Sequence, residues 1–308
     1  MLWKKALWAA GFVAGVLLAA PSLRAQGNYL DVYIAKVKPE KAADAEAIAK
    51  KIADINRHNN GDHVIAMETV YGDGYTYVFT TQRQDYADVD KGGEAFMGAL
   101  NKALGKQGTD KLFADWNSCL VSSHSELRVR RPDLSSKFPK DPQSFAKLVG
   151  ESRMVRTISV HVRPGHLGDF EALLKDVNAH ADRNADTRPV LISQLAEGGQ
   201  GDIYYISFLR NSLAGMDKEP TLKDILGEEG LAKFEKGIAE TAASSQSTIY
   251  RFRPDMSYPP QDVSDVAADY WQPKPEMAAA AKPATAKPKT KTGAEVKPAV
   301  AKSEAKPQ

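Results

Sequence analysis

The sequence predicts an α+β fold made of two βαββαβ units in tandem. The first observation is an internal repeat, because the pattern SS-x-S followed by RPD-x-S occurs at 122–135 and again at 244–257. The second is a pair of apolar helical stripes with the spacing i, i+3, i+4, i+7, one starting at Ala45 and one at Phe170. A repeat at both ends of a unit about 100 residues long indicates duplication of the whole unit.

The elements of the first unit follow from its local patterns. Alternating side chains predict strands, Pro39 suits a first helical turn, and the Asp-Gly pair at 73–74 suits a hairpin turn. The predicted elements are a strand at 29–37, a helix at 39–58, strands at 63–70 and 75–81, a helical region at 85–120 and a strand at 122–130. We expect the helical region to break near the glycine pair 92–93 and within 105–108.

The second unit repeats this order. Its predicted elements are a strand at 154–162, a helix at 164–182, strands at 190–196 and 202–209, helices within 211–243 and a strand at 244–253. The predicted divisions of the chain are a first unit at 28–135, a linker at 136–153 with one short helix, a second unit at 154–257, and a segment at 258–273. We expect Tyr258, Tyr270 and Trp271 to dock that last segment onto the body.

The order βαββαβ is that of the ferredoxin-like unit. In both units a first strand leads through [KR]-P into a helix, at 37–39 and 162–164, and the fourth strand ends just before Arg-Pro-Asp. On these features, residues 28–257 resemble the dimeric α+β barrel superfamily of antibiotic-biosynthesis monooxygenases, haem-degrading monooxygenases and stress-responsive barrel proteins. The resemblance implies that one chain forms, as an intrachain α+β barrel, what members usually form as a dimer. We therefore expect a monomer.

Both ends of the chain differ from its body. Residues 1–25 have a basic start, an uncharged apolar stretch and a small residue at the end, which is typical of a signal peptide cleaved after Ala25. This predicts a periplasmic or secreted protein, with an uncleaved membrane anchor as the alternative. Residues 274–308 are rich in Ala, Lys and Pro and predict a disordered tail. The tail either makes a weak electrostatic contact with the envelope or only adds solubility.

Charge and cysteine content exclude several classes of function. The net charge is +2, but residues 1–25 carry +3 and residues 274–308 carry +5, so the body carries −6. An acidic body argues against nucleic acid as a partner. The single cysteine, Cys119, excludes an internal disulfide and a Cys-based zinc site, and its apolar surroundings predict a buried, inert thiol.

Strand alternation places a set of polar side chains in the space between the two sheets. The members of this set are Lys36, His124, Glu126, Arg128, His161, Gln246 and Tyr250. Polar groups that converge in an apolar cavity are typical of a small-molecule site. The alternative is a polar network of His124, Glu126 and Arg128 with Lys36 that only fixes the register of the sheets.

Neither a metal nor a cofactor is predicted. His124, His161 and Glu126 could form a two-His, one-carboxylate set, but no His-x-His or His-x-x-x-His spacing supports one. The resemblance implies, for its haem-degrading branch, an Asn on strand one, a Trp on strand three and a His on the second helix. Here Asn28 precedes the first strand, Trp116 lies in the helical region and His124 lies on the fourth strand. The Trp and the His are thus on other elements.

The leading hypothesis is an exported small-molecule-binding barrel protein of unknown ligand. A first alternative is a cofactor-free or haem-dependent monooxygenase of the same superfamily, with His124 or His161 as the candidate catalytic base. A second alternative is an envelope-associated scaffold that uses the tail.

Overall fold

The computed structural model describes residues 28–272. The predicted signal peptide and the predicted tail lie outside the described residues. Within 28–272, no helix has the length and apolar character needed to cross a membrane.

Both units have the predicted βαββαβ order. The first contains β1 (Tyr29–Val37), α1 (Ala42–His58), β2 (Ile65–Tyr71), β3 (Thr76–Arg83), α2 (Tyr86–Cys119) and β4 (Leu120–Arg130). The second contains β5 (Met154–Val162), α4 (Leu167–Arg183), β6 (Leu191–Glu197), β7 (Ile203–Arg210), α5 (Leu222–Thr241) and β8 (Ala242–Phe252). Between them lies α3 (Pro142–Glu151), and the described chain ends with α6 (Gln261–Ser264) and α7 (Ala268–Trp271).

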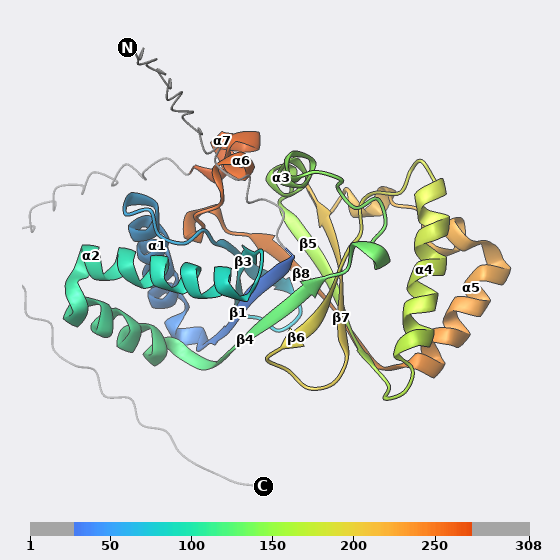
Figure 1. Cartoon of the computed structure of the whole chain (residues 1–308), viewed down its shortest axis with the longest axis horizontal. Coiled ribbons are helices and arrows are strands. Elements are labelled where there is room, and N and C mark those ends of the chain that lie inside the picture. Colours follow the sequence, from blue (N-terminus) through green and yellow to red (C-terminus); the bar gives the residue numbers. More distant parts are fainter. Residues whose placement is uncertain (1–27, 273–308) are drawn as a thin grey trace, which may run out of the picture. The chain divides into compact units, whose positions relative to one another are not determined.

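The eight strands form one closed antiparallel barrel in the order β1-β3-β2-β8-β5-β7-β6-β4. The two sheets join edge to edge, because β2 pairs with β8 and β4 pairs with β6. Closure gives every strand of the barrel two neighbours and leaves the barrel without an exposed sheet edge. The helix pair α1 and α2 lies outside the first sheet and the pair α4 and α5 outside the second, on opposite sides of the strands (Figure 1). The prediction of tandem ferredoxin-like units in an intrachain barrel is confirmed.

Alternation along the strands divides apolar residues between the outer face and the interior. On β1, Ala35 and Val37 face outward and pack against Ala45 and Ala49 of α1. On β5, Val160 faces outward and packs with Phe170 of α4. Each helix pair thus buries the outer face of its own sheet, and the interior side chains are left to line the barrel.

Glycines break the long second helix of each unit at equivalent places. Gly105 in α2 has a φ of 67° and Gly227 in α5 has a φ of 72°, a conformation that favours glycine. The predicted break near Gly92 is wrong, since the helix continues through it. A Cβ at Gly92 would overlap the guanidinium of Arg83, which is held in place by Asp31 and Asp62, so glycine suits this close approach.

The linker helix α3 closes one end of the barrel. Its Phe145 and Val149 are buried in the same cluster as Val32, Phe252 and Trp271. The Trp271 indole N–H donates to the carbonyl oxygen of Gly150 at 2.9 Å, so α7 holds α3 from outside. Both lie at the same end of the strands (Figure 1).

The repeated RPD-x-S motif crosses from each unit to the other. After β4, Leu134 is fully buried in the helix–sheet core of the second unit, with Phe170 and Leu174. After β8, Met256 is buried in the corresponding core of the first unit, with Ala45. Each unit therefore completes the core of the other, which explains why the motif recurs.

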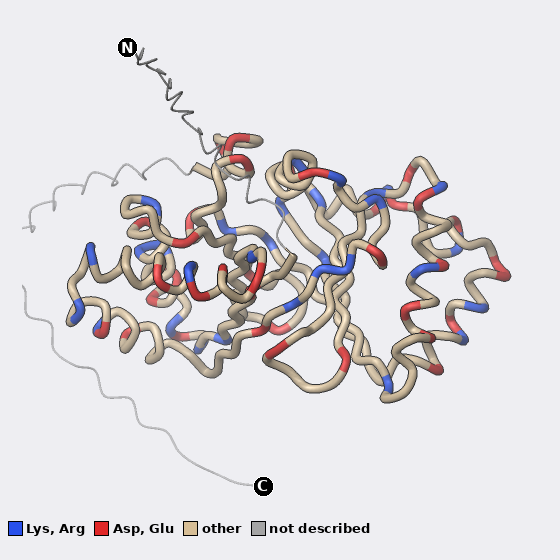
Figure 2. Tube along the Cα trace, in the orientation of Figure 1, with Lys and Arg blue, Asp and Glu red and all other residues tan. Residues whose placement is uncertain are grey.

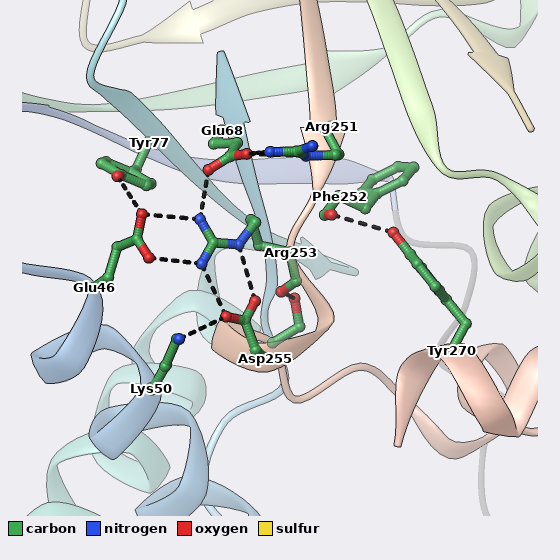
Figure 3. Close-up of polar contacts among 10 residues, drawn as sticks. Glu46, Lys50, Glu68, Tyr77, Arg251, Phe252, Arg253, Asp255 and Tyr270 are labelled. Atoms are coloured by element: carbon green, nitrogen blue, oxygen red, sulfur yellow. Dashed lines mark hydrogen bonds and ion pairs between the residues drawn. The ribbon is translucent and has the colours of Figure 1, made fainter. Parts of the chain in front are cut away.

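Arg253 of this motif is the centre of an ion-pair network between the units (Figure 3). Its guanidinium bonds both carboxylate oxygens of Glu46 on α1, at 3.1 and 2.8 Å, and also pairs with Glu68 and Asp255. The Tyr77 hydroxyl donates to Glu46 at 2.8 Å. Burial alone would lower the pKa of Arg253, but the three carboxylates outweigh it and raise that pKa above its ordinary value.

The units meet at two seams, one where β2 pairs with β8 and one where β4 pairs with β6. Arg253 lies at the first seam, and Arg131 occupies the equivalent place at the second. It bonds Glu171 of α4 at 2.5 Å, Asp133 at 2.8 Å and Gln194 of β6 at 2.7 Å. The Tyr204 hydroxyl donates to Glu171 at 2.7 Å. Gln194 stands where the first network has Glu68, so this network holds one carboxylate fewer.

Acid should weaken both networks. A hydrogen bond from Arg253 lowers the pKa of Glu46, and one from Arg131 lowers that of Glu171, below the ordinary value of 4.5. A carboxyl with a lowered native pKa stabilises the fold above its unfolded pKa and loses that contribution as the pH falls through its native value. We expect the free energy of unfolding, measured by urea denaturation, to fall between about pH 5 and pH 3. Glu171→Gln should reduce this slope, and an unchanged slope would contradict the assignment.

Candidate functional site

The barrel encloses a cavity of about 390 Å³. Its walls are the inward-facing side chains of all eight strands, together with Phe145 and Val149 of α3. Lining residues at one end are exposed, namely Asp73, His161 and Gln246. At the opposite end α3 closes the barrel. The cavity is therefore reached from the end with the exposed polar residues and is closed at the end that α3 covers.

The structure places five of the seven predicted site residues on the cavity wall. These five are Glu126, Arg128, His161, Gln246 and Tyr250. Lys36 does not line the cavity, because its ammonium group pairs with Asp73 and donates to the carbonyl oxygen of Gly74 at 2.5 Å. His124 is half exposed and contacts the wall only through Glu126. Whether any of the seven binds a ligand stays a prediction.

Glu126 and Arg128 form a compact buried cluster on β4. The Arg128 guanidinium bonds the Glu126 carboxylate at 2.6–2.7 Å and lies 3.5 Å from the centre of the Tyr205 ring. The same carboxylate accepts from the Tyr205 hydroxyl at 2.8 Å and lies 3.2 Å from a ring nitrogen of His124. Burial alone would raise the pKa of Glu126, but Arg128, Tyr205 and His124 hold it below its ordinary value. The pair is thus charged and internally neutral.

The predicted register network is present only in part. His124, Glu126 and Arg128 are joined as expected, whereas Lys36 belongs to the separate pair with Asp73. The second unit has no charge at the equivalent positions on β8, where Gln246, Thr248 and Tyr250 stand. Burial raises the pKa of Tyr250, so this phenol is neutral at neutral pH. Apart from Asp73 at the exposed end, the Asp, Glu, Lys and Arg residues of the wall therefore lie on β4.

Arg130 is one of the cavity residues that the sequence analysis missed. It lies two residues beyond Arg128 on the same inward face, next to α3, and only 8% of its surface is exposed. Its guanidinium lies 4.4 Å from the centre of the Phe145 ring. The alternation that placed His124, Glu126 and Arg128 on the inner face of β4 also places Arg130 there, two residues further along the strand.

A second cavity, of about 470 Å³, lies outside the barrel between the first sheet and its two helices. Its lining is mainly apolar and includes Phe79, Phe96, Phe113 and Trp116. The Trp116 indole N–H donates to the Tyr33 hydroxyl at 3.1 Å. Cys119, near the end of the same helix, is buried in the adjoining core.

The residues of the two cavities do not fit a haem group. No His or Cys lines the outer cavity, and His161 is the single His that lines the barrel cavity, at its exposed end. Asn28, Trp116 and His124 lie on three separate parts of the first unit and form no common site. Across residues 28–272, no three His, Cys, Asp or Glu side chains are grouped so as to hold a metal ion.

Comparisons with known proteins concern the fold. No family model and no curated protein matches the chain. Among solved structures, an anthrone oxidase-like protein has 13% identity and a TM-score of 0.49, and the match covers 75% of this chain and 93% of that one. A mutant chlorite dismutase from Candidatus Nitrospira defluvii has 11% identity and a TM-score of 0.41, with 79% and 97% covered. A heme-binding protein from Thermus thermophilus has 10% identity and a TM-score of 0.41, with 75% and 94% covered. At such values, function has to be argued from the chain's own cavity.

Proposed function

We propose that this chain is an exported protein that binds a small molecule inside its barrel. The observation that carries the proposal is the barrel cavity of about 390 Å³, which has one exposed end and one closed end. Ligand sites are commonly clefts of about 300–1,000 Å³ with apolar walls and a few polar groups. The wall has this composition, since it combines apolar residues such as Val32, Met67 and Phe252 with polar groups of β4 and β5.

The polar cluster does not account for the cavity. If Glu126 and Arg128 served only to fix the register, the interior could close around them, as protein cores usually do. Glu126, Arg128 and Tyr205 instead satisfy one another along one part of the wall, and the cavity continues beside them to α3. This supports binding over a purely structural role.

A neutral fluorescent naphthylamine, N-phenyl-1-naphthylamine, tests the proposal. We expect saturable 1:1 binding that Ser159→Phe abolishes, because Ser159 lines the cavity and a phenyl ring there would obstruct it. Ser123→Phe is the matched control, since Ser123 is exposed on the outer face of β4. Circular dichroism would establish that both variants are folded. Equal binding by the two variants would contradict the proposal.

The cofactor-free monooxygenase remains a second candidate because His161 lines the exposed end of the cavity. An imidazole there could accept a proton from a substrate that projects from the barrel. His161→Gln should then abolish turnover, whereas in a binding protein it should change only the affinity.

Export and the role of the tail also belong to the proposal. A cleaved signal peptide would give a mature N-terminus at Gln26, which N-terminal sequencing of the exported protein would identify. If the chain is a scaffold instead, removal of 274–308 should release it from the envelope, while changes in the cavity should have no effect.

A further inference from the structure

Arg130 is a buried cation without a counter-charge among the residues that the structure describes. Its Nε is buried and has no hydrogen-bond partner, and none of the ion pairs among residues 28–272 includes it. The Phe145 ring at 4.4 Å gives a favourable cation–π contact but accepts no N–H. Buried charges in proteins are normally paired or hydrogen-bonded, because an isolated one is costly to remove from water.

The other charged groups of the cavity are already paired with one another. Glu126 is saturated by Arg128 and Tyr205, and Asp73 at the exposed end pairs with Lys36. The cavity therefore holds one uncompensated positive charge, located at its closed end. Outside the barrel, Lys, Arg, Asp and Glu are mixed along the helices, so no comparable excess of one sign marks them (Figure 2).

The charge is present under ordinary conditions. Burial lowers the pKa of Arg130 to about 10, so the guanidinium stays protonated at neutral pH. It presents N–H donors in a fixed planar fork, which matches the two oxygens of a carboxylate. Val149 and Leu209 are among the apolar groups at this end, and Ser193 of β6 lies opposite Arg130 on the neighbouring strand.

We propose that the ligand of the barrel is an amphipathic monoanion that places its carboxylate, or a similar singly charged group, on Arg130 and its apolar body along the cavity. This deepens the proposed function and rests on it. A single positive charge matches a single negative one, because the other charged groups of the cavity are already paired. The exposed end, with its polar residues, is where such a molecule would enter.

Isothermal titration with octanoate and its neutral analogue octanamide tests the charge preference. We expect the wild-type protein to bind octanoate at least about 30-fold more tightly, in line with the cost of truncating one partner of a buried charged pair. Arg130→Met should abolish this preference while octanamide still binds, since it removes the charge and keeps an apolar side chain of similar length. Arg130→Lys should retain part of it, because the charge remains but the fork is lost. Octyl sulfate as a third ligand separates carboxylates from other monoanions.

The outcomes separate this inference from the proposed function. Equal affinity for octanoate and octanamide in the wild-type protein, or a preference that survives in Arg130→Met, would overturn the assignment of Arg130 and leave the binding function standing. Binding of none of the ligands, together with no binding of the neutral naphthylamine, would overturn the proposed function itself. Ser159→Phe is the control for surface binding, since octanoate that still binds this variant lies outside the barrel.

Discussion

Replacing Arg253 by Met is expected to lower the free energy of unfolding by about 3 kcal/mol, the lower end of the range for breaking a buried ion pair. The substitution leaves Glu46, Glu68 and Asp255 close together without their shared cation. Arg251, Lys50 and the Tyr77 hydroxyl still contact these carboxylates and limit the loss (Figure 3). Urea denaturation followed by circular dichroism measures the effect.

Arg131→Met is the matched comparison, because Arg131 occupies the equivalent position at the other seam. It leaves two carboxylates, Glu171 and Asp133, and Asp133 is half exposed, so we expect a smaller loss of about 1–2 kcal/mol. The order of the two losses is the informative result. If Arg253→Met lowers the free energy of unfolding by no more than Arg131→Met does, the number of carboxylates left without a cation does not determine the stability of the two seams.

Replacing Arg130 by Met should have the opposite sign and raise the free energy of unfolding of the ligand-free protein by about 1–4 kcal/mol. Most substitutions of a buried residue destabilise a protein. Arg130 differs because it is 8% exposed and contributes no ion pair that the substitution would break. Met can adapt to the irregular space beside Phe145. A gain in stability would show that Arg130 is not retained for the sake of folding.

Arg128→Met is the control for that prediction. Arg128 lies one step away on the same face of the same strand, but it neutralises Glu126. Its removal leaves a buried carboxylate with the Tyr205 hydroxyl and His124 alone, so we expect a loss of about 3 kcal/mol. If Arg130→Met destabilises the protein as much as Arg128→Met does, Arg130 is a structural residue and the argument for an anionic ligand fails.

The repeat and the alternation of side chains predicted much of the architecture. Apolar stripes in the helices and alternating residues in the strands are local properties, and they gave both βαββαβ units and the division of each strand into an outer and an inner face. The same alternation brought five candidate residues, Glu126 among them, onto the wall of one cavity.

Contacts between the units could not be predicted in the same way. Nothing in the local pattern of RPD-x-S states that Leu134 packs into the second unit or that Arg253 bonds Glu46 in the first. The closing helix α3 depends likewise on a tertiary contact, since Phe145 and Val149 sit in a segment that reads only as a linker. Lys36 was expected on the cavity wall, but its ammonium group pairs with Asp73 in the turn between β2 and β3. This contact depends on the fold and could not be read from the alternation along β1.

The most direct test of a ligand site inside the barrel is a crystal structure of the protein grown with octanoate. The account predicts electron density for one molecule in the barrel cavity, with its carboxylate within hydrogen-bonding distance of the Arg130 guanidinium and its chain directed toward His161. Density for octanoate only in the outer cavity against Trp116, or only on the protein surface, with none in the barrel cavity, would contradict the account.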